Sequence, residues 1–247
     1  MLKAQTLDNV RASGRTVDKP TFRGTVTDLI GSSLVTTKEP QAFLVEQSAD
    51  WVLPVHFHRE QQFQLFVGGS GLIGKTEIAP LTVHYASPHS GYGPLTSRAD
   101  GIAYLTLRPL SDTGAYYLPE SRPELRTDIK KVQKHAAPKS YVTEQELQQL
   151  TQAYVETLLQ PDDTGLAAWL MRVPPNATAT APESVGNSEG RYYVVTKGTL
   201  QHNGTVLNAL ATLYSADTTP QALTAGGNGA EVIVLQFPYN AQFEAAA

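Results

Sequence analysis

The sequence predicts an all-β protein built from two copies of one sandwich-like or barrel-like domain. Short apolar runs alternate with turn residues, as in Gly68-Gly69-Ser70-Gly71, Asn203-Gly204 and Gly226-Gly227-Asn228-Gly229. Charged residues make up 17% of the chain, below the ~25% typical of soluble domains, and Thr, Gly, Pro, Tyr and Val are abundant. The chain also resembles itself at an offset of 129 residues, which indicates a duplication.

The repeat needs no gap over about 45 positions. The apolar runs 65–67 and 102–107 fall on the runs 194–196 and 231–236. Identities at this offset include Gly69 with Gly198, Leu81 with Leu210, Tyr85 with Tyr214 and Pro109 with Pro238. Each identity alone carries little weight, but the shared frame with strand-like runs in both copies predicts a duplicated fold. Asn203-Gly204 is also the preferred pair for a two-residue hairpin turn.

The elements follow in order along the chain. Residues 1–24 are polar, and we expect an N-terminal arm that extends onto a neighbouring chain. Residues 25–110 form the first copy, 111–160 a connector and 161–240 the second copy. In the connector, Thr143 and Glu146 have the spacing of a capping box, and the residues Leu147, Leu150, Tyr154 and Leu158 follow at helical spacing before Pro161. We therefore predict a helix over 143–160.

Composition excludes several classes of function. The net charge is −4 and no extended basic cluster is present, so we expect no nucleic-acid partner. The chain has no cysteine, which excludes disulfides, thiolate metal sites and thiol nucleophiles. No apolar run approaches the ~20 residues needed to cross a bilayer, and the first residues show no apolar signal region. We expect a cytoplasmic protein without a membrane partner.

The main candidate for chemistry is the run His56-Phe57-His58 followed by Gln62 and Gly69. Side chains at i and i+2 of a strand project from the same face, so one strand can offer two imidazoles to one metal ion. Imidazole suits Zn, Cu, Fe and Ni, and open positions on Fe, Cu or Mn can bind oxygen. The competing interpretation is a hydrogen-bonded pair of histidines without a metal.

These residues resemble the cupin superfamily, in particular bicupins of two fused barrels. His56-x-His58, three residues, Gln62, six residues and Gly69 match the first cupin motif, except that the family pattern places Glu at Gln62. The segment 87–94 resembles a variant second motif in which Tyr92 stands where the family has histidine, with His89 three residues earlier. The resemblance covers roughly residues 25–110 and 165–240. It implies a double-stranded β-helix, or jelly roll, in each copy.

The resemblance also implies a site in the first copy. The implied ligands of a divalent metal (Zn, Fe, Mn, Ni or Cu) are His56, His58, Gln62 and His89. Gln62 is otherwise a hydrogen-bonding pocket residue, and His89 is otherwise a histidine on the rim. An amide oxygen carries no charge, so Gln62 would leave more of the ion's charge available to an anionic substrate or hydroxide.

Two residues are candidates for moving protons. Tyr92 could also be a ligand or a hydrogen-bond donor to substrate, and Glu60 could replace Gln62 as the carboxylate or simply face solvent. His84 lies in the middle of a predicted strand and falls on Leu213, so we expect it in the core. In the second copy the candidate positions become Val185, Asn187, Arg191, Thr218 and Gln221. No ligand set survives there, so we expect a structural barrel.

Two functions fit these patterns. The first is a metal-dependent enzyme, dioxygenase-like or cyclase/isomerase-like, acting on a small oxygen-bearing molecule that is aromatic or polyketide-like. The second is a non-catalytic bicupin that binds a small molecule or serves a structural or storage role. Either would have a small-molecule partner, and a homodimer is a further expectation.

Overall fold

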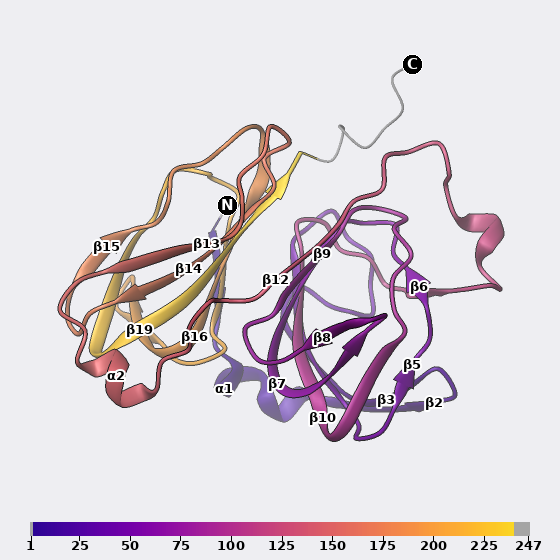
Figure 1. The fold of residues 1–247 in the computed structure, drawn as a ribbon, viewed down its shortest axis with the longest axis horizontal. Coiled ribbons are helices and arrows are strands. Elements are labelled where there is room, and N and C mark those ends of the chain that lie inside the picture. The colour runs from indigo at the N-terminus through magenta and orange to yellow at the C-terminus, as the bar shows by residue number, and fades with distance from the viewer. Residues whose placement is uncertain (1, 240–247) are drawn as a thin grey trace. The chain divides into compact units, whose positions relative to one another are not determined.

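The computed structural model describes residues 2–239, which divide into two compact units (Figure 1). We call residues 10–136 the first unit, and residues 2–9 together with 137–239 the second unit. Regular structure is almost entirely antiparallel β-strand, which confirms the predicted all-β class. Neither α-helix within residues 2–239 has the length and apolar character that crossing a bilayer requires.

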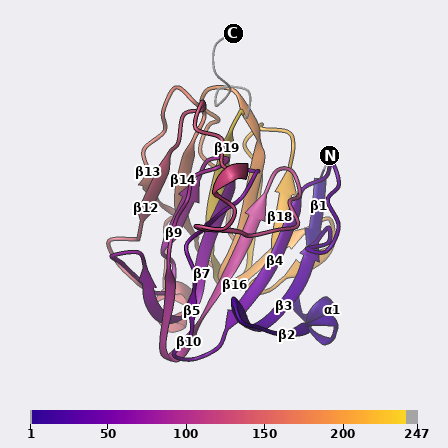
Figure 2. The same cartoon turned by 90° about the vertical axis from the view of Figure 1, so that its right-hand side faces the viewer.

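The first unit contains a single large sheet. Its strands are β2 (Arg15–Lys19), β3 (Phe22–Ile30), β4 (Gln41–Gln47), β5 (Val52–Leu53), β6 (His56–Phe57), β7 (Gln62–Ile73), β8 (Thr76–Ile78), β9 (Val83–Ala86), β10 (Leu95–Arg108), β11 (Tyr116–Tyr117) and β12 (Gln133–Ala136). The strand order is β12-β9-β7-β10-β4-β3-β2, with β5 on β10 and β8 on β7, while β6 pairs with β11. Figure 2 shows β7, β10, β4 and β3 running side by side.

The second unit repeats this arrangement. Its elements are β1 (Leu2–Gln5), α2 (Glu144–Gln148), β13 (Tyr154–Leu159), β14 (Ala167–Val173), β15 (Thr178–Thr180), β16 (Ser188–His202), β17 (Thr205–Leu207), β18 (Thr212–Ser215) and β19 (Ala222–Pro238). The short helix α1 (Leu7–Val10) links β1 to the first unit's residues. The strand order is β1-β18-β16-β19-β14-β13, and Figure 1 shows the long neighbours β16 and β19 in orange and yellow.

The structure confirms the 129-residue repeat through the first half of each copy. Strands β8 and β9 fall on β17 and β18 at that offset, residue for residue. Gly69 and Gly198 both have a left-handed φ, of 69° and 65°. A Cβ on either glycine would lie about 2 Å from a backbone oxygen of the next strand, 2.0 Å in the first case and 2.1 Å in the second. Only glycine fits both positions, which explains why the sequence keeps it in each copy.

The ungapped frame is wrong in the last long strand of each copy. In β10, Ile102 pairs with Gly69, whereas in β19 the residue that pairs with Gly198 is Ala230. The offset there is therefore 128, because one residue fewer lies between Ser215 and Leu223 than between the equivalent residues Ala86 and Leu95. Arg108 consequently corresponds to Gln236, not to Phe237. The expected Asn203-Gly204 turn is confirmed between β16 and β17, with φ values of 48° and 76°.

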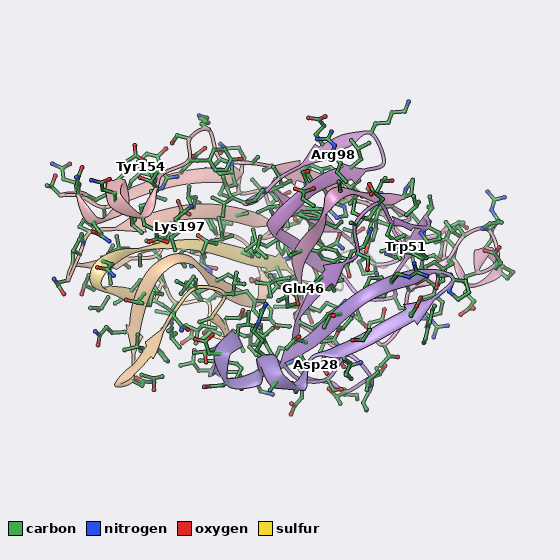
Figure 3. All side chains as sticks on the ribbon, turned by 90° about the horizontal axis from the view of Figure 1, so that it is seen from below. Asp28, Glu46, Trp51, Arg98, Tyr154 and Lys197 are labelled. Atoms are coloured by element: carbon green, nitrogen blue, oxygen red, sulfur yellow. The ribbon has the colours of Figure 1, made fainter. Side chains whose placement is uncertain are left out.

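The predicted helix over 143–160 is wrong beyond its first turns. The capping box is present, since Thr143 Oγ1 accepts from the Glu146 backbone N–H and the Glu146 carboxylate accepts from that of Thr143. The helix ends after Gln148, and residues 154–159 instead form β13, paired with β14. β-Branched and aromatic side chains in 154–157 favour a strand, and the edge of β14 supplies backbone partners. Tyr154 of this strand projects outward, 40% exposed (Figure 3).

The predicted N-terminal arm is also wrong, because the strands within residues 2–24 pair with strands of their own chain. Leu2–Gln5 pairs with β18, and Arg15–Lys19 forms a hairpin with the strand that begins at Phe22. The connector likewise contributes Gln133–Ala136 as an edge strand on β9. Alternating polar and apolar residues in these short segments suit half-buried edge strands, and that pattern is too brief to distinguish from a loop in the sequence.

Candidate functional site

The interior face of the first unit's sheet carries adjoining polar side chains. Thr106 and Arg108 alternate with buried leucines on β10, so both point to the same face. The register places Arg108 opposite Gln41 of β4 and Thr106 opposite Gln64 of β7. Gln62 begins β7 and lies beside Arg108. Three of these five residues, Gln41, Gln62 and Gln64, are glutamines. The sheet therefore surrounds the buried guanidinium of Arg108 with neutral amides.

His56 is held rigidly by its backbone and by both ring nitrogens. Its backbone N–H and C=O pair with those of Tyr92 at 3.1 and 2.9 Å. Its Nδ1 lies 2.7 Å from the carbonyl oxygen of Pro54, which can only accept, so Nδ1 carries the proton. The lone pair of Nε2 therefore faces the Tyr92 hydroxyl, 3.0 Å away, and accepts its hydrogen bond.

Arg108 is the centre of the site and is 2% exposed. Its Nε and Nη2 donate to Gln62 Oε1 at 3.2 and 2.8 Å. Its Nη1 donates to Gln41 Oε1 at 2.6 Å and to the backbone oxygen of Asp112 at 2.7 Å. Its Nη2 also donates to His58 Nδ1 at 3.0 Å. Five hydrogen bonds thus match the five N–H groups of a guanidinium.

These contacts fix the direction of a hydrogen-bond chain. Because arginine has only donors, Gln62 must present its oxygen to Arg108, so its Nε2 donates to Tyr92 Oη at 2.5 Å. The Tyr92 hydroxyl then donates to His56. The chain runs from Arg108 through Gln62 and Tyr92 to His56, and each polar atom in it has a partner of the right kind.

His58 is neutral in this arrangement. Its Nδ1 accepts from Arg108, so that nitrogen carries no proton. The carboxylate of Asp112 lies 3.6 Å from the same nitrogen, which is too long for a hydrogen bond. Asp112 is held instead by the backbone N–H of Arg59, 2.9 Å from its Oδ2. Asp112 therefore balances the charge of the buried guanidinium without forming an ion pair with His58.

Burial sets the protonation state of the titratable groups. It lowers the pKa of His56 to about 3, with a smaller contribution from His58, and that of His58 to about 4, with a smaller contribution from Arg108. Burial raises the pKa of Tyr92 well above its ordinary value, so the phenol stays protonated. Burial opposes ionisation of Asp112, but the Arg108 guanidinium and the backbone N–H of Arg59 act in the other direction, and the pKa of Asp112 lies below its ordinary value. At neutral pH the site has fixed charges.

A cavity of about 370 Å³ opens over these residues, within the range of small-molecule sites. Its aromatic lining consists of Phe22, Phe43, Tyr92, Tyr104 and Tyr117, and its polar lining includes His56, His58, Gln64, Thr106, Arg108 and Asp112. Arg15 also lines it and is tied to both carboxylate oxygens of Asp28 at 3.2 Å (Figure 3 labels Asp28). The cavity therefore combines flat apolar walls with several hydroxyl groups.

The structure brings His56, His58, Gln62 and Tyr92 together, and His89 lies on the other side of their strand. His89 stacks on Phe57 at 5.3 Å, and strand alternation places Phe57 on the opposite side from the two neighbouring histidines. His89 and Glu60 are both absent from the cavity lining. This geometry does not support the role predicted for His89 as a ligand, and the catalytic role predicted for Glu60 stays a prediction.

His84 is fully buried, as expected of a core residue. Its Nδ1 lies 2.8 Å from Gln64 Oε1, and its ring packs on Tyr92 at 4.8 Å and on His135 at 4.6 Å. It supports the wall behind the cavity.

The predicted metal ligands do not fit a resident ion. Within residues 2–239, no group of three or more His, Asp or Glu side chains is arranged to hold a metal. The lone pairs that would bind it, on His58 Nδ1 and Gln62 Oε1, accept from Arg108. A divalent ion about 4 Å from a guanidinium is repelled by about 8 kcal/mol at an effective dielectric of about 20. Asp112 already balances the arginine, so a metal would have to displace these hydrogen bonds.

No family model and no curated protein sequence matches the chain. Solved structures do match it. A pirin from Escherichia coli in complex with nickel(II) is 10% identical, with a TM-score of 0.59, over 96% of this chain and 99% of that one. An 11S globulin from Wrightia tinctoria with an auxin-binding site is 10% identical, with a TM-score of 0.62, over 96% and 83%. A salicylate 1,2-dioxygenase from Pseudoaminobacter salicylatoxidans with gentisate is 10% identical, with a TM-score of 0.56, over 96% and 81%.

The protein has the cupin fold. This confirms the jelly-roll resemblance at the level of the fold, and these neighbours include both a dioxygenase and an 11S globulin. His56, His58 and Gln62, which the motif grouped, lie near one another in the structure, and their functional role stays a prediction. It gave no indication of Arg108, which no cupin motif position marks. The one available signal was a charged residue that ends a long apolar run, Leu105-Thr106-Leu107-Arg108, on a strand expected to be buried.

Proposed function

We propose that the first unit binds a small oxygen-bearing organic molecule in the cavity above Arg108. One observation carries the proposal: a cavity of about 370 Å³ lies over a floor of polar side chains whose hydrogen-bond donors and acceptors are already fixed in orientation. A rigid polar floor keeps the cost of ordering low when a ligand enters. The aromatic walls favour a flat ring.

Two phenols and a threonine supply the recognition groups. Tyr104, Tyr117 and Thr106 all line the cavity, and burial keeps Tyr104 protonated by raising its pKa. Hydroxyl donors beside a buried guanidinium favour a ligand oxygen that carries negative charge, such as a carboxylate or phenolate. Two neighbours of the same fold are recorded with small molecules of this kind, gentisate and an auxin, which supports the choice of probes.

The test uses gentisate and indole-3-acetate with thermal unfolding and calorimetry. A ligand at 100 times its Kd should stabilise the wild type by about 2.7 kcal/mol. Thr106→Trp fills the cavity and should abolish the effect, whereas Tyr154→Phe on the outer strand of the second unit should leave it intact. Stabilisation that survives in Thr106→Trp would place the ligand elsewhere, and no binding of either probe or of related aromatic acids would count against the proposal.

A metal-dependent dioxygenase-like or cyclase/isomerase-like enzyme is the second candidate. The observation in its favour is that two neutral imidazoles, His56 and His58, share one site on the cavity wall. If a metal is bound, mass spectrometry of the native protein should find it, and His56→Ala/His58→Ala should lose it. Turnover of a probe, or oxygen consumption that depends on the two histidines, would favour this candidate over simple binding. A homodimer remains a prediction that sedimentation measures.

A further inference from the structure

The second unit contains a buried arginine in the equivalent place. Arg191 is 0% exposed, and its Nε and Nη2 donate to Gln236 Oε1 at 3.0 and 2.7 Å. Its Nη1 donates to the backbone oxygen of Pro182 at 2.6 Å. The Nε2 of Gln236 in turn donates to the backbone oxygens of Gly165 and Val185, both at 2.7 Å. This unit therefore also surrounds one guanidinium with an amide and backbone oxygens.

The two pairs occupy the same two positions with the residues exchanged. Gln62 begins β7 and corresponds to Arg191 of β16 at the 129-residue offset. Arg108 near the end of β10 corresponds to Gln236 of β19 at the 128-residue offset. In both units the pair joins the same two strands, and Nε with Nη2 grips the one amide oxygen. The guanidinium comes from one strand in the first unit and from the other strand in the second.

We propose that a guanidinium is the resident cation of each unit and that, in the first unit, Arg108 takes the place that the His56-x-His58 motif would give to a metal. This inference concerns the floor of the cavity for which a ligand is proposed above. It is tested by metal binding alone and does not depend on that ligand being bound. It changes the meaning of Gln62. The amide is the partner of Arg108, not a weakened metal ligand.

The chemistry of the amide supports this assignment. Gln62 accepts twice from Arg108 through its oxygen and donates to Tyr92 through its nitrogen. A glutamate there would accept at both ends and would lose the donor that orients the Tyr92 hydroxyl towards His56. The sequence thus matches the neutral residue to the cation it holds. His58 completes the match, because its Nδ1 accepts from the same guanidinium.

The test measures metal binding in the untagged full-length protein. Wild type is incubated with Ni²⁺ or Zn²⁺, freed of excess ion by gel filtration and analysed by mass spectrometry. We expect no more than a trace of ion in wild type and about one ion per chain in Arg108→Ser/Gln62→Glu, which would offer two imidazoles and a carboxylate. Adding His58→Ala to that variant should remove the ion. The matched exchange in the second unit, Arg191→Ser/Gln236→Glu, should gain none, because no histidine lies in the corresponding segment.

A second measurement follows the metal response of the wild-type protein. The Nε–H signal of Arg108 in a ¹⁵N NMR spectrum, assigned by its loss in Arg108→Lys, should exchange slowly with solvent and keep its width when Ni²⁺ is added. Near-stoichiometric metal in wild type that His58→Ala removes would overturn the inference, as would broadening of the Arg108 signal by Ni²⁺. A folded Arg108→Ser/Gln62→Glu variant that stays free of metal would also count against it.

Discussion

Acidification should unfold the first unit before the second. His56 and His58 have folded pKa values of about 3 and 4, well below the ordinary value of 6.5, because burial disfavours their charged forms. Between pH 6.5 and those values, the two histidines are protonated in the unfolded chain but remain neutral in the folded unit. Stability contributed by the two neutral histidines is therefore complete above pH 6.5 and is lost as the pH falls towards 4.

The size of the effect follows from the two shifts. Each pH unit below 6.5 removes about 1.4 kcal/mol per histidine until the folded pKa is reached. At pH 5, His56 and His58 should each remove about 2 kcal/mol, or about 4 kcal/mol together. His84, His89 and His135 have lowered pKa values as well and lie in the same unit, so they act in the same direction. His202 is the one histidine of the second unit.

The chain has two tryptophans, one in each unit, which makes the assay direct. Trp51→Phe leaves Trp169 to report the second unit, and Trp169→Phe leaves Trp51 to report the first. Urea unfolding followed by fluorescence at pH 7.5 and pH 5 gives the free energy of unfolding for each unit. His56→Gln should lower the stability at pH 7.5 but reduce the loss between pH 7.5 and 5 by about 2 kcal/mol. Equal losses from both reporters, or a Trp51 signal unchanged between pH 7.5 and pH 5, would refute the reasoning.

Three stability predictions follow from packing. Leu147→Ala removes the one buried side chain of α2 and should cost about 2–4 kcal/mol in urea unfolding, while the exposed neighbour change Gln148→Ala should cost little. Gly198→Ala places a Cβ 2.1 Å from a backbone oxygen of the facing strand and should lower the free energy of unfolding by about 2–4 kcal/mol. The control Gly227→Ala places a Cβ with nothing within 4 Å. Comparable losses of stability in both variants would contradict the steric argument. Thr143→Ala removes half of the capping box and should lower the free energy of unfolding by about 1 kcal/mol, with Thr143→Ser expected to restore it.

The central strands of the fold could be predicted from the sequence, but several edge strands of the sheets could not. Alternating strands, turn residues and the glycines at 69 and 198 have strong local signatures, because strand period and left-handed backbone restrict the residue types. The edge strands 2–5, 133–136 and 154–159 were missed because pairing decides them. A segment of four to six residues becomes a strand when a neighbouring strand offers its unpaired backbone, and that information lies elsewhere in the chain.

The site was predicted in part for a related reason. The His56-x-His58 spacing and Gln62 predicted a group of side chains that do lie near one another, since strand geometry fixes which side chains share a face. Arg108 was missed because its hydrogen-bond partner Gln62 lies on another strand, and because the repeat offset changes from 129 to 128 before Arg108. The ungapped offset of 129 aligns Arg108 with Phe237, so the sequence comparison does not show its exchange with Gln236. A buried cation is recognisable only when the groups that surround it are known.

The pairing of β1 with β18 determines the order in which this chain can complete its folding. Leu2 pairs with Ser215, more than two hundred residues later. At ribosomal rates of about 5–20 residues per second, the first strand waits some tens of seconds for its partner to be made. All residues of the first unit are synthesised in that interval, so it can fold while the opening strand is still unpaired. Strand β1 is therefore among the last strands to pair. Removal of the residues that form β1 would leave β18 as an unpaired edge strand.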